Sequence, residues 1–152
     1  MADNNHKVVE VEHVVVKFAG DSGDGMQLSG TQFSDTTAFA GNDLSTFPDY
    51  PSEIRAPQGT IAGVSGFQLH FGEVEVNTPG DKADVLVALN PAALKANLKW
   101  VKDGAIVIID IDNFDNKQYK KAGYIDDPIE EGLLTGYNLV KAPISSLTRS
   151  SV

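Results

Sequence analysis

Three glycines and two aspartates stand together where a strand-like run of the sequence ends. Residues 14–19 are rich in β-branched and aromatic side chains, and helical spacing of apolar residues begins after residue 25. The loop between them contains Gly20, Asp21, Ser22, Gly23, Asp24 and Gly25. A glycine-rich turn from strand to helix points backbone N–H groups and the positive end of the helix dipole at one place. The pattern therefore predicts a site for an anion such as a phosphate or a carboxylate.

The order of the glycines argues against an ordinary dinucleotide fingerprint, because the spacing is Gly-x-x-Gly-x-Gly rather than Gly-x-Gly-x-x-Gly. The acid expected about 20 residues further on to hold a ribose is also missing, since Asp43 follows a Gly-Asn pair rather than a strand. Asp21 and Asp24 stand where a phosphate would bind, and like charges repel. Two roles remain open for them: capping the helix, or hydrogen-bonding to a neutral or cationic group, including one on a ligand.

Two further places carry candidate binding residues. Glu53 and Arg55 lie two residues apart in a proline-bounded loop. They could form an ion pair, or the planar guanidinium of Arg55 could bind a carboxylate or phosphate. Asn90 precedes Pro91 at the start of a predicted helix. Asn90 could be a plain helix N-cap, or it could line the carboxyl edge of the sheet, where α/β proteins bind ligands.

Alternating strand and helix patterns predict an α/β fold. Strands are predicted at 12–19, 44–47, 60–71, 84–89, 105–110 and 139–144, and helices at 26–40, 92–101 and 115–122. A turn at 72–73 should lead into a strand at 74–76 that forms an antiparallel hairpin with 60–71. The expected architecture is a three-layer α/β/α sandwich with a mixed, mostly parallel sheet and an antiparallel hairpin insertion.

Apolar spacing also predicts which side chains are buried. In the first helix an apolar stripe at Leu28, Phe33, Thr37 and Ala40 should pack on the sheet. Six aromatic residues occupy core-like positions: Phe18, Phe33, Phe39, Phe67, Phe71 and Trp100.

Composition excludes several classes of function. The 152 residues include no cysteine, so this chain can supply neither a disulfide nor thiolate ligands for an iron–sulfur cluster. The formal charge of −9 has no basic stripe, which argues against nucleic acid and anionic membranes as partners. No apolar run approaches the length of a membrane span, and the polar start does not resemble a secretory signal. These features favour a cytoplasmic protein.

We expect three segments along the chain: a flexible leader at 1–11, one α/β domain at 12–148, and the start of a connection to absent domains at 149–152. The last residues show no pattern of a closing helix, so the sequence is expected to be a truncated piece of a longer chain.

Three motifs carry a family resemblance: FAGDSGDGM at 18–26, SEIRAP at 52–57 and LNPAAL at 89–94. They resemble the N-terminal gamma domain of the alpha subunit, KorA type, in the 2-oxoacid:ferredoxin oxidoreductase family. The resemblance covers roughly 12–148. It implies oxidative decarboxylation of a 2-oxoacid such as 2-oxoglutarate with coenzyme A, giving acyl-CoA, carbon dioxide and reduced ferredoxin.

The resemblance also implies partners and cofactors. Thiamine pyrophosphate would be bound by other domains and the beta subunit, and the iron–sulfur cluster would be held elsewhere in an oligomeric complex. This domain would contribute to assembly and to the coenzyme A region, near Arg55, and would be inactive alone. Two other functions remain open: a non-catalytic domain that contacts neighbouring subunits, and a stand-alone dinucleotide-binding oxidoreductase.

Overall fold

The computed structural model describes residues 8–21, 23–49 and 64–151. In this part of the chain, six strands form one mixed sheet in the order β2-β3-β1-β4-β5-β6. The strands are β1 (His13–Asp21), β2 (Asp43–Asp49), β3 (Val64–Gly72), β4 (Ala83–Ala88), β5 (Val101–Asp110) and β6 (Asn138–Ala142). The helices are α1 (Met26–Phe39), α2 (Pro91–Asn97), α3 (Asn116–Lys121) and α4 (Ile144–Ser150), with short 3-10 turns η1 (Leu98–Trp100) and η2 (Ile111–Asn113).

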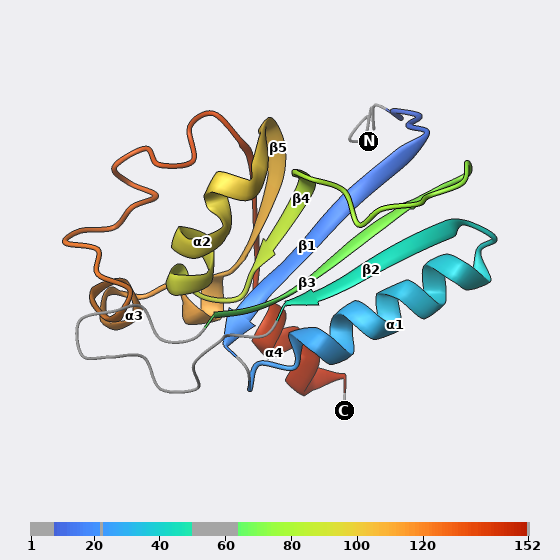
Figure 1. Cartoon of the computed structure of the whole chain (residues 1–152). Coiled ribbons are helices and arrows are strands. Elements are labelled where there is room, and N and C mark those ends of the chain that lie inside the picture. Colours follow the sequence, from blue (N-terminus) through green and yellow to red (C-terminus); the bar gives the residue numbers. More distant parts are fainter. Residues whose placement is uncertain (1–7, 22, 50–63, 152) are drawn as a thin grey trace, which may run out of the picture.

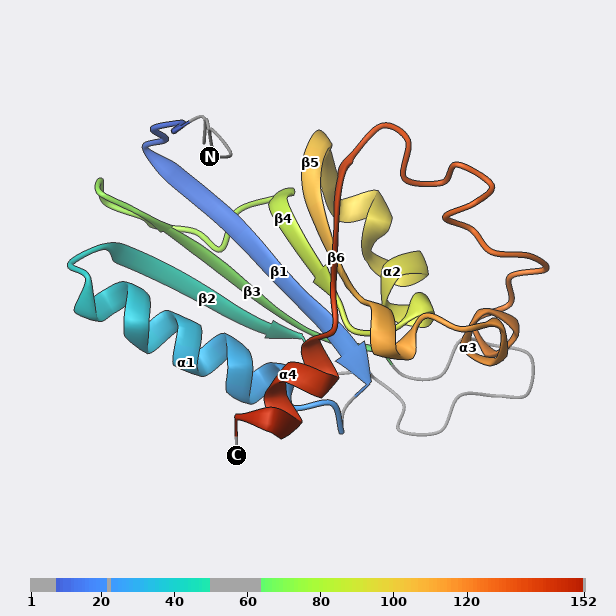
Figure 2. The same cartoon turned by 180° about the vertical axis from the view of Figure 1, so that it is seen from behind.

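Helices lie on both faces of the sheet, which confirms the predicted α/β/α layering. Helices α2 and α3 lie on one side, and α1 packs along β2 and β3 on the other (Figures 1 and 2). Helix α4 lies near the arrowhead of β1, at the same end of the sheet as the start of α1 (Figure 2). The glycine loop after β1 and the turn at Asn90 after β4 are the two predicted binding turns among the described residues. Because β1 and β4 are parallel, both turns lie at this end of the sheet.

The sheet is mixed, as predicted, but the hairpin is made of different strands. β1 pairs with β4 in parallel and with β3 in antiparallel orientation, while β4, β5 and β6 continue the parallel part. The antiparallel hairpin consists of β2 and β3. Residues 74–76, predicted as its second strand, form no strand. The physical reason is that β3 already pairs with β1 along one edge and β2 along the other, so no edge is free for another strand.

Helix α1 packs on the sheet through a different face from the one predicted. Leu28 is 63% exposed, whereas the buried residues are Met26, Gly30, Ser34 and Thr37. Of the predicted stripe, only Thr37 is buried. Gly30 lies directly against the ring of Phe67, where a larger side chain has no room. Close approach of the helix to an aromatic residue of β3 therefore favours small residues over large apolar ones.

The aromatic residues divide between core and surface. Phe67 is buried, as predicted. Phe33 makes edge-to-face contacts with Phe18 and Phe71, with ring centroids 5.8 Å apart in each pair. The prediction is wrong for Phe39, the last residue of α1, which is 97% exposed, for Trp100, which is 49% exposed, and for Phe33, which is 39% exposed despite its ring contacts.

The larger apolar core lies on the α2 side of the sheet. It includes fully buried side chains of β4 and β5, such as Leu86 and Val107, and Leu94 of α2. Burying such side chains contributes roughly 1.5 to 3 kcal/mol each. This core fixes α2, and with it the turn at Asn90, against the ends of the strands.

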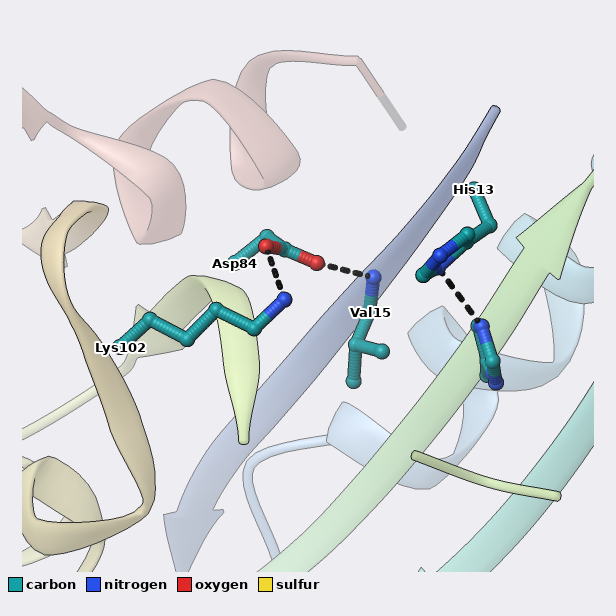
Figure 3. A network of polar contacts seen from close by, with 5 residues as sticks. His13, Val15, Asp84 and Lys102 are labelled. Carbon is teal, nitrogen blue, oxygen red and sulfur yellow. Dashed lines mark hydrogen bonds and ion pairs between the residues drawn. The ribbon is translucent and has the colours of Figure 1, made fainter. Parts of the chain in front are cut away.

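A polar network ties three strands together at the opposite end of the sheet. Asp84 of β4 accepts a hydrogen bond from the backbone N–H of Val15 at 2.8 Å and forms an ion pair with Lys102 of β5 at 2.7 Å (Figure 3). On the other side of β1, His13 Nδ1 lies 3.1 Å from Nε2 of His70 on β3. The parallel pairing of β1 with β4 begins at Val16 and Val85. The Asp84 carboxylate therefore accepts the hydrogen bond of the Val15 N–H, which lies one residue before that pairing.

Two predictions about helices after residue 90 need correction. The helix predicted to run to residue 101 ends at Asn97, and β5 begins at Val101, so Gly104 lies within a strand. A closing helix, α4, also forms where none was predicted, because side chains from the end of β5 and η2 bind its first turn. Among the described residues, no helix has the length and apolar character needed to cross a membrane.

Candidate functional site at the carboxyl edge of the sheet

Three turns meet where β1, β4 and β5 end. β1 ends at Asp21 and leads into the glycine loop, β4 leads into Asn90, and β5 ends at Asp110. These strands are parallel neighbours, so their carboxyl ends share one edge of the sheet. Such an edge is the usual place for ligands in open α/β folds.

Asn90 joins two of these turns. Its Oδ1 accepts a hydrogen bond from the backbone N–H of Ala93 at 2.8 Å, which caps α2. Its Nδ2 donates to Asp21 Oδ1 at 3.1 Å and to Asp24 Oδ2 at 3.3 Å. Asn90 is therefore a helix cap, and the same side chain also orients both carboxylates of the loop.

The two aspartates do not cap α1. The N-cap of α1 is Gly25, at a φ of 72°, and no side chain caps the helix. Asp24 instead accepts a hydrogen bond from the backbone N–H of Asp21 at 2.8 Å, which closes the loop on itself. Of the two roles left open by the sequence, the structure supports hydrogen bonding to a neutral group, the Asn90 amide. The N-terminal amides of α1 thus have no side-chain cap from the described residues, and a Cβ at Gly23 or Gly25 would meet no atom within 4 Å.

The loop places Asp24 in an unfavourable environment for a charge. Partial burial raises the pKa of Asp24 above its usual range, and repulsion from Asp21 adds to this, while hydrogen bonds from the Asp21 N–H and from Asn90 oppose it. The folded state consequently binds more protons than the unfolded state between the ordinary carboxyl pKa and the raised one. Stability from this group therefore falls as pH rises through that window.

We expect Asn90→Ala to raise the pKa of Asp24 further, because the variant removes a hydrogen bond that favours the ionised carboxylate. The variant should also lose about 0.5 to 2 kcal/mol of stability with the α2 cap. An NMR titration of the side-chain carboxyl carbons measures the pKa. Asn90→Ser separates the two effects, since serine keeps an N-cap acceptor but has no amide donor. An Asp24 pKa unchanged in both variants would show that Asn90 does not control the loop charge.

The third turn is built around a carboxylate that the sequence analysis missed. Asp110 is fully buried, yet it accepts hydrogen bonds from Ser145 Oγ at 2.6 Å and from Asn113 Nδ2 at 2.9 Å. It also accepts longer ones from the backbone N–H groups of Asp112 and Ser145, both at 3.3 Å. The sequence signal for this site was the position of Asp110 at the end of the apolar run 105–110, because a buried acidic residue rarely lacks a partner.

Between these turns lies a crevice of about 430 Å³. It is lined by the glycine loop and α1 on one side, with Asp24, Gly25 and Ser29, and by α4 on the other, with Ser145, Thr148 and Arg149. The uncapped amides of α1, the Ser29 hydroxyl and the Arg149 guanidinium can donate hydrogen bonds to an anionic or polar ligand. The hydroxyls of Ser145 and Thr148 already donate to Asp110 and to the Ile144 carbonyl. Asp24 and Asp110 limit where an anion can sit, because both carboxylates line the same crevice.

The predicted site residues are thus only partly brought together. Gly20, Asp21, Gly23, Asp24, Gly25 and Asn90 meet at the carboxyl edge. Ser22, Glu53 and Arg55 lie outside the described residues, so their predicted roles stay predictions. No group of three or more metal-ligating side chains gathers anywhere in the described residues.

The fold and the site together define an open α/β domain with a crevice at the carboxyl edge of parallel strands. Comparison of the sequence with protein families identifies it more closely. The chain belongs to the pyruvate ferredoxin/flavodoxin oxidoreductase family, whose family model matches residues 15–151. This confirms the family resemblance that the three sequence motifs predicted.

A curated relative has similar sequence over nearly the whole chain. The 2-oxoglutarate oxidoreductase subunit KorA of Mycobacterium tuberculosis is 49% identical over 142 residues, which are 93% of this chain. The chain spans about a fifth of that relative's length, because the match covers 22% of it.

Solved structures share the fold at lower identity. A 2-oxoglutarate:ferredoxin oxidoreductase from Magnetococcus marinus, with 2-oxoglutarate, coenzyme A and succinyl-CoA bound, matches 93% of this chain and 22% of its own with a TM-score of 0.69 and 23% identity. The gamma subunit of a keto/oxoacid ferredoxin oxidoreductase from Geobacter sulfurreducens matches 88% of this chain and 62% of its own with a TM-score of 0.59 and 16% identity. These likenesses establish the fold.

Proposed function

We propose that the chain is the N-terminal gamma domain of the alpha subunit of a cytoplasmic 2-oxoacid:ferredoxin oxidoreductase, with 2-oxoglutarate as the expected 2-oxoacid. The domain would span 12–148, preceded by a leader. The observation that carries this proposal is the 49% identity to a 2-oxoglutarate oxidoreductase subunit over 93% of the chain. The proposed enzyme decarboxylates the 2-oxoacid, transfers the acyl group to the thiol of coenzyme A and passes two electrons to ferredoxin.

Within that enzyme the crevice is the part of this domain that suits coenzyme A. Coenzyme A presents phosphate groups and a polar, flexible arm. The α1 amides, Ser29 and Arg149 are donors suited to such groups, and the crevice volume of about 430 Å³ suits part of the molecule rather than all of it. The chain itself would bind and orient this part, and Asp110 would hold the α4 wall in place.

The other cofactors are proposed to bind outside this chain. An iron–sulfur cluster needs thiolate ligands, and the sequence has no cysteine. Thiamine pyrophosphate, which stabilises the carbanion formed on decarboxylation, would be bound by the remaining alpha-subunit domains and the beta subunit. We therefore infer that the domain serves assembly and coenzyme A binding, and that ferredoxin is reduced by the oligomeric complex as a whole.

The proposal is tested by reconstitution. Co-expression of this chain with the remaining alpha-subunit domains and the beta subunit should give coenzyme A-dependent reduction of a viologen dye by 2-oxoglutarate, and the chain alone should give none. A complex that assembles but shows no turnover with 2-oxoglutarate or another 2-oxoacid would overturn the proposal.

Calorimetry on the chain separates the alternative functions. Binding of coenzyme A favours the proposal, binding of NAD favours a stand-alone dinucleotide-binding oxidoreductase, and binding of neither favours a domain that only contacts other subunits. Arg149→Met should weaken coenzyme A binding by about tenfold or more, since a charge-assisted hydrogen bond is lost. Lys141→Met, which removes an exposed cation outside the crevice lining, is the matched control.

A further inference from the structure

One face of the parallel half of the sheet is left uncovered by the helices of the described chain. Side chains alternate between the two faces of a strand, so β4, β5 and β6 present apolar residues on both sides. On the α2 side, Leu86 of β4 and Val107 of β5 are fully buried. On the α1 side, Ile106 of β5 is 41% exposed and Val140 of β6 is 45% exposed. Parallel strands are normally covered on both faces, so the α1 side lacks part of a layer.

Strand register defines the extent of this uncovered surface. Phe33 of α1 contacts Phe18 of β1, so Phe18 lies on the α1 side of the sheet. The row that continues from Phe18 across β4, β5 and β6 consists of Val87, Ile108 and Val140. We call the apolar residues on this side of β4, β5 and β6 the open face: Val85, Val87, Ile106, Ile108 and Val140. Helix α1 packs on β1, β2 and β3, so it lies beside the open face rather than over it (Figure 2).

Helix α4 brings the chain to the same side of the sheet. Asp110, which alternation places on the same side of β5 as Ile108, accepts the hydrogen bond of Ser145 in the first turn of α4. Figure 2 shows α4 on the α1 side, with the end of the chain beside it. The curated relative is much longer than this chain, since the match covers 22% of it. In the proposed alpha subunit, the residues after 152 would therefore leave this domain on the side of the open face.

The small size of the open face favours a tethered segment over a separate subunit. A stable interface between two proteins uses about 20 to 30 residues on each side, whereas the open face consists of a few side chains on three strands. A segment joined by a short connection has an effective concentration of about a millimolar, so a small apolar contact can hold it. A second copy of this chain is disfavoured further, because two chains with a formal charge of −9 repel each other.

We propose that the open face is covered by an amphipathic helix from the residues directly after 152 of the proposed alpha subunit. The inference rests on the proposed function, because it takes this chain as the N-terminal part of that subunit. A helix suits the position, since helices cover the faces of parallel strands and α1 already covers β1 and β3 on this side. Its apolar stripe would pack on Ile106 and Val140, and its other side would be polar. About 40 residues after 152 leave room for a connection and a helix of average length.

A photo-cross-linker at residue 140 identifies the occupant. The full-length alpha subunit carries p-benzoylphenylalanine in place of Val140 and is assembled with the beta subunit. Irradiation and peptide mass spectrometry should show a link to the first 40 or so residues after 152, without a change of subunit size on a denaturing gel. The same cross-linker at Ile125, which is 90% exposed in the loop after α3, is the control and should give no such link. Links only to the beta subunit, to a second copy or within this domain overturn the inference.

Amide hydrogen exchange on the assembled complex gives a second measurement. Val140→Lys would place an ammonium under the proposed helix, so the amides of the first 40 or so residues after 152 should exchange on the order of tenfold faster than in the wild type. Ile125→Lys, the same kind of change at an exposed position away from the open face, should leave their exchange unchanged. Unchanged protection of this segment in Val140→Lys overturns the inference.

The outcome can be separated from the fate of the proposed function. If the complex reduces dye with 2-oxoglutarate but residue 140 is linked to the beta subunit, the docking inference is wrong and the function stands. If residue 140 is linked to the segment after 152 but the complex turns over no 2-oxoacid, the docking inference stands and the function fails.

Discussion

Gly30→Ala is expected to destabilise the chain by about 1 to 3 kcal/mol, although alanine is the better helix former by roughly 1 kcal/mol. A Cβ at residue 30 would overlap the ring of Phe67, which is itself only 6% exposed on β3. To make room, α1 must move away from the sheet or the ring must leave its position. Gly30→Val should cost more, because its branched side chain adds volume at the same point. Urea unfolding followed by circular dichroism measures the change.

The assignment to Phe67 can be checked with a double-mutant cycle. Gly30→Ala should cost clearly less in a Phe67→Leu background, where the ring is absent, than in the wild type. Gly136→Ala is the matched control, because a Cβ there would meet no atom within 4 Å and its φ is not positive. Equal costs of Gly30→Ala in both backgrounds would mean that the helix contacts β3 in some other way.

Gly30 also illustrates what sequence patterns could and could not predict. Sequence patterns predict the strands correctly, because runs of β-branched residues such as those of β1, β4 and β5 favour buried strands regardless of their neighbours in the fold. The hydrophobic periodicity of α1 predicts the wrong buried face, because the residues that face the sheet are mostly small or polar. Where a helix approaches a sheet closely, space rather than hydrophobicity decides the contact, so glycine and serine face the sheet while Leu28 faces out.

Local sequence patterns predict two parts of the candidate site. The glycine loop and the Asn90 cap each depend on a few neighbouring residues, and both lie at the predicted edge. The hydrogen bonds from Asn90 to Asp21 and Asp24 join residues 69 and 66 positions apart, which no local pattern encodes. Local patterns also do not predict α4, because the first turn of this helix is held by Asp110, which lies 35 residues earlier in the chain.

Asp110→Ala is expected to destabilise the chain by about 2 to 4 kcal/mol, because several donors lose a buried acceptor at once. The donors concerned are the Ser145 hydroxyl and amide and the Asn113 side chain. Helix α4 should detach from the end of β5, so its amides should exchange faster with solvent. The crevice would then lose the wall that carries Arg149, and the coenzyme A binding that we propose for this crevice should weaken in parallel.

Two companion variants test whether the buried carboxylate is the cause. Asp112→Ala removes an exposed carboxylate that accepts from the backbone N–H of Ser146 at 2.7 Å, in the same first turn of α4. It should cost about 0.5 to 1.5 kcal/mol, the usual net value of one hydrogen bond. Ser145→Ala removes only the hydroxyl and should fall between the two. Hydrogen exchange that leaves α4 as protected in Asp110→Ala as in the wild type would contradict the role of Asp110, because the helix would then be held by its own apolar contacts.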